Sequence, residues 1–557
     1  MSYLLSDETK HSLWIGDSKI SSSKQSLLLT TGFVLMVVLL GLLMVVTGSV
    51  AAQSADSVVA SDGTGDYTSI QDAVDDATEG DRIKVEAGSY EQNARVDKTI
   101  TLYAPNGANI TNTSTSTSGF QISGDSNPTI SGFNLIGWRL AISAGASQGS
   151  WTVKDTKITG GSCGVCAVGT PGNWTVKNTV IENAGTISGY GSSGNWTITN
   201  STIEGTDILA MRSTANPIIK NSSLHDISGL AIEAENTSGT ITVSNTNINE
   251  AERGVGFDQG STGDLIVENT TFEKITDEAV DAENSSGTIT VSNTNINGVE
   301  DAVNAETSSG NIILRDTNIQ TARNGINAEK SESRITIKNL TVNDTEGDGI
   351  DASNATGNAT VRKSSFTNMG DKSIDVIDSE GSWQIHESIL TGGSEGTLDA
   401  WGAKRMINAS RNYWGAASGP SETFCGSGGA IGGYNVTMYP YYTDSSLTTL
   451  PSATTSGTVE ITDSCLIPED IDSSGEQTLT LTVAQMSADG ETDEISITMP
   501  EDVSVDDVNN PQAVGTPYEV NVTNDGDPVT LEVDPDEPTE TVDFVIRVPM
   551  ELSSSSG

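Results

Sequence analysis

The sequence predicts an all-β solenoid, a parallel β-helix, and two observations support this prediction. The first is a short phrase that returns roughly every 22 to 24 residues between about residues 149 and 392, a period typical of solenoids. The second is the pattern within the phrase: in Ile241-Thr-Val-Ser244, apolar and polar residues alternate with the period of a strand. A helical solenoid is the competing class, and the β-branched residues and frequent glycines argue against it. The phrase begins at Trp151, Trp174, Trp196, Pro217, Ile241, Leu265, Ile289, Ile312, Ile335, Ala359 and Trp383.

An Asn or Asp ends most of these strands, and its position predicts a sharp corner. Both residue types tolerate the left-handed backbone conformation and bond to their own backbone. Because successive coils lie about 4.8 Å apart, the corner side chains can hydrogen-bond to one another along the axis. The corner residues are Asp155, Asn178, Asn200, Asn221, Asn245, Asn269, Asn293, Asp316 and Asn339.

A second short strand follows in most repeats and carries an acidic or amide residue at an outward position. We expect these residues to stack in a column: Glu233, Asp281, Asn304, Asn327, Asp351, Asp375 and Asp399, with Glu235, Glu283, Glu306 and Glu329 beside them.

Three interpretations of this column stay open. It is a solvated face, because salt suppresses the repulsion of roughly 1 kcal/mol between neighbouring carboxylates in water. Alternatively it holds Ca²⁺, the one cofactor that it suggests, or a glycan. It could also supply an acid/base pair for sugar chemistry. The catalytic candidates are Asp281, Asp351 and Asp375. The candidates for binding a glycan or a cation are Glu233, Asp281, Asp351, Asp375 and Asp399.

The first 52 residues predict export. The apolar run from Leu27 to Val46 is about 20 residues long, enough to span a bilayer. The small residues of Val50-Ala-Ala52 then offer a signal-peptidase site before Gln53. Cleavage is the preferred interpretation and an N-terminal anchor the alternative. Either one places the remainder outside the cytoplasm, secreted or at the cell surface.

The net charge of the chain limits which classes of partner are expected. With 75 Asp and Glu against 27 Lys and Arg, the net charge is −48, which argues against nucleic acid and against anionic membrane surfaces. A halophilic protein is the favoured interpretation, and an acidic extracellular protein at ordinary salinity is the alternative. A polysaccharide or cell-surface glycan is the expected partner. Membrane contact is expected only through residues 27–46, if they stay uncleaved.

Two segments resemble a known family. Asp62-Gly-Thr-Gly-Asp-Tyr-Thr-Ser-Ile-Gln-Asp-Ala-Val74 is similar to the opening of pectin methylesterases and of many other pectin-lyase-like right-handed parallel β-helix proteins. Within it, Thr68 or Ser69 would cap a short amphipathic helix covering the open first coil. Asn412-Tyr-Trp-Gly-Ala-Ala-Ser-Gly-Pro420 resembles the closing motif of β-helix surface proteins, including a periplasmic copper-binding family. The resemblance covers residues 56–445. It implies a right-handed, single-stranded β-helix of roughly thirteen coils with an N-terminal helical cap.

Fragments that resemble catalytic motifs are incomplete. Gly254-Val-Gly-Phe-Asp-Gln-Gly260 resembles the segment that bears a pectin methylesterase catalytic Asp, but the family's Arg segment has no counterpart. Gly347-Asp-Gly-Ile-Asp351 resembles part of a polygalacturonase pattern whose other parts are missing. We interpret both as products of the repeat. A copper site is also not expected, because His11, His225 and His386 lie far apart in the sequence.

After Pro451 the repeat stops, and alternating runs predict a small antiparallel β-sandwich. The expected domains are residues 1–52 (signal or anchor), 53–450 (β-helix) and 455–557 (sandwich). The favoured disulfides are Cys163–Cys166 and Cys425–Cys465 among three possible connectivities, with a redox Cys-x-x-Cys as the alternative. The glycosylation candidates are Asn109, Asn173, Asn195, Asn269, Asn339, Asn408 and Asn521.

Two functions remain in competition. The favoured one is a non-catalytic surface protein that presents a long acidic face for adhesion or glycan binding. The other is a polysaccharide-active enzyme, a lyase, glycoside hydrolase or carbohydrate esterase, that uses Asp351, Asp375 or their neighbours.

Overall fold

The computed structural model describes residues 55–112, 118–422, 427–433, 435–438 and 440–450, together with the backbone of short strands elsewhere. The predicted export segment, residues 27–46, lies outside the described residues, as do Cys425 and Cys465. No helix in the described part of the chain is both long and apolar enough to cross a membrane. Near the N-terminus, β1 (Trp14–Ile15) and β2 (Ser18–Lys19) form an antiparallel pair.

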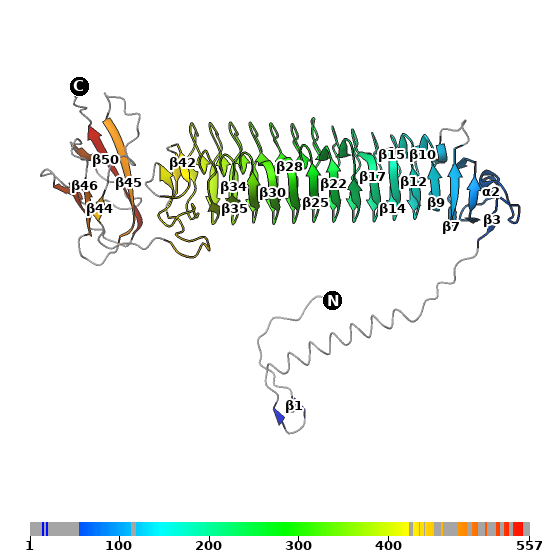
Figure 1. The fold of residues 1–557 in the computed structure, drawn as a ribbon, viewed down its shortest axis with the longest axis horizontal. Coiled ribbons are helices and arrows are strands. Elements are labelled where there is room, and N and C mark those ends of the chain that lie inside the picture. The colour runs from blue at the N-terminus through cyan, green and yellow to red at the C-terminus, as the bar shows by residue number, and fades with distance from the viewer. Residues whose placement is uncertain are drawn as a thin grey trace. The chain divides into compact units, whose positions relative to one another are not determined.

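The described chain is an all-β parallel solenoid of about 15 turns. Figure 1 shows its coils stacked in sequence order, from the blue strands near α2 to the yellow β42. The count exceeds the roughly thirteen coils expected, because turns before the first phrase and after the last one also pair in register. Three strips of parallel strands line the coil, and we call them sheets A, B and C.

Sheet A contains the repeated phrase. Its strands are β3 (Ser57–Val59), β4 (Arg82–Val85), the start of β7 (Thr101–Thr111) and of β9 (Thr129–Ile136), β11 (Trp151–Lys154), β14 (Trp174–Lys177), β16 (Trp196–Thr199), β18 (Ile218–Lys220), β21 (Ile241–Ser244), β24 (Leu265–Glu268), β27 (Ile289–Ser292), β29 (Ile312–Arg315), β31 (Ile335–Lys338), β34 (Ala359–Arg362), β37 (Trp383–His386), β40 (Ile407–Asn408) and β43 (Val436–Thr437).

Sheet B follows the Asn corner. Its strands are β5 (Gly88–Tyr90), the ends of β7 and β9, β12 (Lys157–Thr159), β15 (Val180–Ser188), β17 (Thr202–Leu209), β19 (Ser223–His225), β22 (Asn247–Ala251), β25 (Thr271–Ile275), β28 (Asn295–Asn304), β30 (Asn318–Asn327), β32 (Thr341–Thr345), β35 (Ser365–Thr367) and β38 (Ile389–Leu390).

Sheet C carries the predicted column. Its strands are β6 (Ala94–Val96), β8 (Ser118–Gly124), β10 (Leu140–Ser147), β13 (Cys163–Cys166), β20 (Leu230–Glu233), β23 (Arg253–Gly256), β26 (Val280–Asp281), β33 (Ile350–Asp351), β36 (Ile374–Asp375), β39 (Leu398–Asp399) and β42 (Ala430–Gly432), with β41 (Ser421–Glu422) beside β42. The long strands β15, β17, β28 and β30 bend from sheet B into sheet C.

Alternation explains why the coil closes around an apolar core. In β21 the side chains of Ile241 and Val243 are fully buried, whereas Thr242 and Ser244 are partly exposed. The same positions stack from coil to coil, and three indoles, Trp151, Trp174 and Trp196, stack inside with ring centroids 5.3 and 4.7 Å apart.

The corner prediction is confirmed. Asn178 and Asn245 both have φ of 49°, in the left-handed region. The side chains also bond along the axis, since Asn178 Nδ2 donates to Asp155 Oδ1 at 3.0 Å and Asn339 Nδ2 donates to Asp316 Oδ1 at 2.7 Å.

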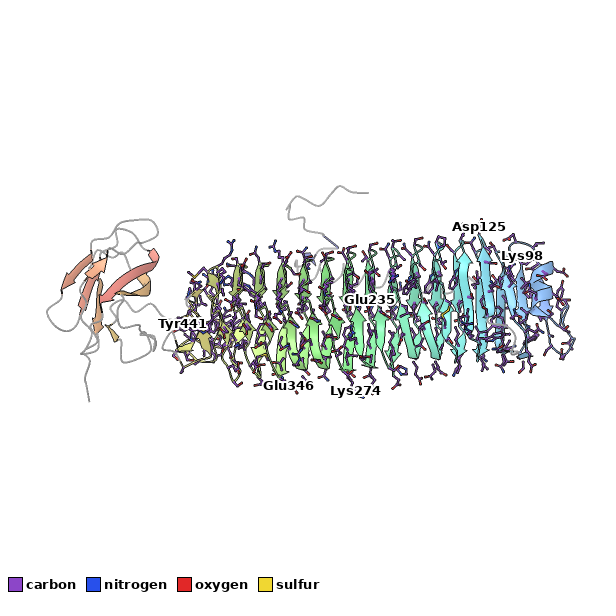
Figure 2. All side chains as sticks on the ribbon, turned by 90° about the horizontal axis from the view of Figure 1, so that it is seen from above. Lys98, Asp125, Glu235, Lys274, Glu346 and Tyr441 are labelled. Carbon is purple, nitrogen blue, oxygen red and sulfur yellow. A yellow bond between two sulfur atoms is a disulfide. The ribbon has the colours of Figure 1, made fainter. Side chains whose placement is uncertain are left out.

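A single short helix, α2 (Ile70–Asp76), lies at the N-terminal end of the described solenoid. The hydroxyl of Ser69 accepts a hydrogen bond from the backbone N–H of Asp72, and Ile70 is buried. At the other end of the helix, Lys98 Nζ (Figure 2) donates to the carbonyls of Val74 and Ala77 at 2.9 and 2.7 Å, where a cation suits the helix dipole. That this helix closes the first coil stays a prediction.

Beyond residue 450 only strand backbones are described. One sheet has the order β44 (Thr458–Glu460), β46 (Asp493–Thr498), β49 (Val529–Val533), β48 (Val520–Thr523), and the other has β45 (Glu476–Met486), β50 (Thr539–Pro549), β47 (Asp507–Asn509). All pairings are antiparallel except β44–β46, which is parallel. The packing of the two sheets as a sandwich stays a prediction, as do the domain boundaries.

Candidate functional site: a carboxylate ladder on sheet C

The column predicted for sheet C exists as a register ladder. Strand pairing places each member directly beside the next: Glu233, Gly256, Asp281, Asn304, Asn327, Asp351, Asp375, Asp399 and Gly432. We call this the carboxylate ladder. The sequence therefore predicted its members correctly, apart from the two glycines that interrupt and end it.

The ladder has a local structural cause. Each Asp or Asn ends a strand, and its side-chain oxygen accepts a hydrogen bond from the backbone N–H two residues later: Asp281 from Glu283 (3.2 Å), Asp351 from Ser353 (3.0 Å), Asp375 from Ile377 (2.9 Å) and Asp399 from Trp401 (3.2 Å). Asn304 and Asn327 make the same bond, so the turn accepts either residue type. The turn uses one carboxylate oxygen and leaves the other available.

Several members are less exposed than a solvated face would be. Asp281 and Asp375 are only 3% and 7% exposed, while Glu233, Asp351 and Asp399 are half-buried. Charged side chains lie against both buried positions: Arg253 against Asp281 and Lys372 against Asp375. A purely solvated column does not describe these two buried positions.

The first charged cluster surrounds Arg253, at the start of β23. Its guanidinium lies 2.8 Å from Asp281 Oδ2, 3.6 Å from Asp258 Oδ2, 3.3 Å from Asp277 Oδ2 and 3.6 Å from Glu278 Oε2. We call these five residues the Arg253 cluster. One cation thus faces four carboxyl groups.

Four carboxyl groups around one cation cannot all ionise freely. Burial, followed by the charge of Asp281, raises the pKa of Asp258 to about 6. Burial and a hydrogen bond with Asp277 raise the pKa of Glu278 to about 8. Burial also raises the pKa of Asp281, against the opposing effect of Arg253. The cluster therefore contains two carboxyl groups, Asp258 and Glu278, whose pKa values are raised toward neutral pH.

A second cluster surrounds Lys372, five coils beyond Arg253. Lys372 Nζ is 2.9 Å from Asp375 Oδ2 and 3.5 Å from Asp399 Oδ2. The carboxylates of Asp348, Asp351 and Asp375 lie within 4.8 Å of one another. We call these five residues the Lys372 cluster.

The proton affinities in this cluster also differ. Burial and the charges of Asp375 and Asp351 raise the pKa of Asp348 to about 7. Burial alone would lower the pKa of Lys372, but its hydrogen bond and ion pair with Asp375 raise it. A lysine that stays charged beside an acid titrating near pH 7 is a constellation typical of functional sites, although structural ion networks share it.

The Lys372 cluster does not fit calcium in this arrangement. Calcium takes six to eight oxygen ligands. The ammonium group of Lys372 already bonds Asp375, one of the three carboxylates that lie close enough to share an ion. Lys372 of the chain itself therefore supplies a positive charge where a bound cation would otherwise lie.

Reasoning from the sequence missed six cluster residues: Arg253, Asp258, Asp277, Glu278, Asp348 and Lys372. Asp258 and Asp348 lie in the two Gly-rich segments that we interpreted as chance fragments, and the fold brings both against the ladder. A usable signal was present, since Arg253 and Lys372 are rare cations just before ladder residues in a chain with 27 Lys and Arg.

Other predicted sites fall elsewhere. A disulfide joins Cys163 and Cys166, as expected. Two cavities, of about 580 and 710 Å³, are lined by corner and sheet B residues such as Lys363 and Asn221, and neither includes a ladder member. Of the glycosylation candidates, Asn173, Asn195, Asn269 and Asn339 are exposed, Asn109 and Asn408 are half-buried, and the side chain of Asn521 lies outside the described part.

Residues 140–296 and 261–413 match the family model described as "Right handed beta helix region". The solenoid is a right-handed parallel β-helix. The match and the parallel register fit the right-handed β-helix superfamily, of which pectin-lyase-like proteins are an example. No curated protein sequence matches the chain at the level that marks a relative.

Several solved β-helix structures are similar to the chain. The periplasmic alginate epimerase AlgG has 11% identity and a TM-score of 0.32, over 69% of this chain and 84% of its own. The surface adhesin PfbA of Streptococcus pneumoniae has 13% identity and a TM-score of 0.30, over 55% and 89%. The tailspike of E. coli bacteriophage HK620, in complex with a pentasaccharide, has 9% identity and a TM-score of 0.32, over 80% and 86%. At these scores the similarities say nothing about function.

Proposed function

We propose that this protein is an exported cell-surface or secreted β-helix that binds a polysaccharide along the carboxylate ladder without cleaving it. The observation that carries the proposal is at the C-terminal end of the ladder. There the half-buried carboxylate of Asp399 lies two residues before Trp401, whose side chain is 49% exposed. The backbone N–H of Trp401 donates to Asp399 Oδ1, so the turn places these two residues next to each other.

An exposed indole beside carboxylates suits a sugar. The apolar face of a sugar ring packs against an aromatic ring, and its hydroxyls donate to carboxylate oxygens. The turn uses Oδ1 of Asp351 and Asp399. Oδ2 of Asp351 lies outside this turn bond, whereas Oδ2 of Asp399 also lies 3.5 Å from Lys372 Nζ. Because the ladder repeats with every coil, a linear glycan could contact successive members.

The test is equilibrium binding together with product release. The full chain, in high salt, is incubated with a panel of neutral and uronic-acid polysaccharides. We expect binding to at least one polymer, no new reducing ends, unsaturated ends or released acyl groups, and a loss of at least tenfold in affinity for Trp401→Ala. Ile136→Ala is the matched control, since Ile136 is another exposed apolar side chain, 42% exposed. Binding to no polymer would contradict the proposal.

The second candidate is an enzyme acting on polysaccharides, and the Lys372 cluster is the observation that favours it. An Asp348 carboxyl whose pKa is raised to about 7, close to the ladder carboxylates of Asp351 and Asp375, could pass a proton to or from a sugar. Product formation that falls at least a hundredfold in Asp348→Asn, with glycan binding retained, would establish this function in place of the first.

Export follows from the apolar segment at residues 27–46 and the small residues before Gln53. The acidic composition suits a halophile, and the exposed sequons suit a glycoprotein. The sandwich expected over residues 455–557 would then be an accessory module of the exported protein.

A further inference from the structure

A column of cations runs along sheet A, on the outward side of the repeated phrase. The register places the last residue of each phrase strand beside its counterpart in the next coil, as in Lys154–Lys177 and Arg315–Lys338–Arg362. We call the cationic members of this series the basic column: Lys154, Lys177, Lys220, Arg315, Lys338 and Arg362.

None of these six cations takes part in an ion pair with another described residue. Elsewhere in the described solenoid, cations such as Arg253, Arg323 and Lys330 lie against carboxylates. Arg315, Lys338 and Arg362 are exposed and stand on three consecutive coils. In a chain with a net charge of −48, a row of unneutralised cations calls for an anionic partner.

The molecule itself carries an anionic row with the same spacing. Glu283, Glu306 and Glu329 each follow a ladder residue by two positions, and they also stand on three consecutive coils. Lys330 lies 3.6 Å from Glu306 and 2.6 Å from Glu329, so the row keeps an excess of two negative charges over that one cation. Both rows repeat at the coil spacing of about 4.8 Å.

We propose that the basic column binds the Glu283–Glu306–Glu329 row of a second copy of this chain, side by side. Two identical solenoids have the same rise per coil, so each cation can meet one carboxylate over several coils without distortion. The two surfaces differ, which makes the contact heterologous, and repetition of it yields open rows of molecules rather than closed dimers. Beside the column, Thr336 and Thr360 pair in register and are polar and partly exposed.

The net charge decides how this contact responds to salt. Two copies with 48 negative charges each repel at low ionic strength, and salt screens that long-range repulsion more than it screens pairs in direct contact. We therefore expect association to be strongest at intermediate salt. Nucleic acid and acidic polysaccharides also carry the sign of the whole chain, and a second copy has by construction the rise per coil that sets the spacing of its own carboxylates.

A charge exchange tests the contact. The full chain in nonionic detergent is followed by sedimentation velocity across a range of salt concentrations. We expect the wild type to associate reversibly. We expect Arg315→Glu/Lys338→Glu/Arg362→Glu to associate at least tenfold more weakly, and likewise Glu283→Lys/Glu306→Lys/Glu329→Lys. A mixture of the two variants should associate again, because the exchanged charges attract.

The matched control is Lys84→Glu/Lys157→Glu/Lys404→Glu, which changes the net charge equally at cations paired with Glu86, Glu182 and Asp378. It should associate like the wild type, and thermal unfolding of every variant shows whether it folds. A wild type that stays monomeric throughout, or a mixture that fails to associate, would overturn the proposal. Binding of dextran sulfate to a monomeric wild type, lost in the first variant, would assign the column to an external polyanion and also overturn it.

Discussion

Sheet A and sheet C place charge on the same scaffold in opposite ways. On sheet C, Arg253 and Lys372 are largely covered and each faces several carboxyl groups at 2.8 to 4.0 Å. On sheet A, Arg315, Lys338 and Arg362 are exposed and unpaired within the described chain. The coil sets the same spacing for both rows. The two sheets therefore differ in how far their charged side chains are buried, and not in how far apart these side chains lie.

The difference teaches that stacking alone does not make a site. A column of like charges in water costs roughly 1 kcal/mol per neighbouring pair, which salt removes. Once a charge of such a column is buried, it needs a partner or a proton. Sheet C meets that need with two cations and several raised pKa values, and sheet A meets it with solvent or with a partner molecule.

The largest expected effect comes from removing a covered cation. Arg253→Ala leaves Asp281 and its neighbours buried without their counter-charge, so we expect the free energy of unfolding to fall by about 3–5 kcal/mol. Arg315→Ala is the matched control on sheet A and should change it by less than about 0.5 kcal/mol. Chemical denaturation monitored by circular dichroism measures both. If both substitutions lowered the free energy of unfolding equally, the proposed difference between buried cations on sheet C and exposed cations on sheet A would be wrong.

The next effect concerns the proton on Asp348. Its pKa is raised to about 7, so the folded state holds this proton more tightly than the unfolded chain does. Its contribution to stability is complete below the ordinary Asp pKa near 4 and is lost as the pH rises through about 7. Asp348→Asn should therefore flatten the pH dependence of the melting temperature between roughly pH 4 and 8 and add about 2–4 kcal/mol at pH 8 relative to wild type.

Asp378→Asn, at an exposed carboxylate paired with Lys404, is the matched control for the pH series and should leave the profile unchanged. A variant at Asp348 with the wild-type slope would show that this carboxyl does not carry the proton.

The smallest effect separates the turn from the charge. Asp399→Asn keeps the acceptor for the N–H of Trp401 and should change stability by less than about 0.5 kcal/mol. Asp399→Ala removes that acceptor and should cost about 1 kcal/mol. Thermal melts of the two variants measure the difference. If Asp399→Asn lowers stability as much as Asp399→Ala does, then the negative charge of Asp399, and not its hydrogen bond in the turn, is what the fold requires.

Much of the fold follows from the sequence because the same pattern of apolar, polar and corner residues recurs in many repeats. Alternation in Ile241-Thr-Val-Ser244 and the Asn at each corner fix the strands, the inward faces and the left-handed corners. The order of the ladder follows as well, because residues at equivalent repeat positions become neighbours in register. The Cys163–Cys166 disulfide was also predicted, because the two cysteines are only three residues apart and lie in one coil.

The two clusters could not be predicted in the same way. The side chain of Arg253 is long enough to contact Asp277 and Asp281 in the next coil. A contact of this kind occurs once and produces no periodic pattern in the sequence. Asp375 is only 7% exposed, whereas Asp351 and Asp399 at the equivalent positions of the neighbouring coils are half-buried, and the repeat pattern does not mark this difference. Isolated departures from the repeat, here a cation beside the ladder, are the signal to look for in other solenoids.

The most direct test is to locate a bound polysaccharide on one sheet or the other. A polymer that binds the wild type is titrated against Asp399→Asn/Trp401→Ala on sheet C and against Arg315→Ala/Lys338→Ala/Arg362→Ala on sheet A. We predict at least a tenfold loss of affinity for the first variant and no change for the second. Undiminished binding by the sheet C variant, with loss in the sheet A variant, would contradict the assignment of the glycan to the carboxylate ladder.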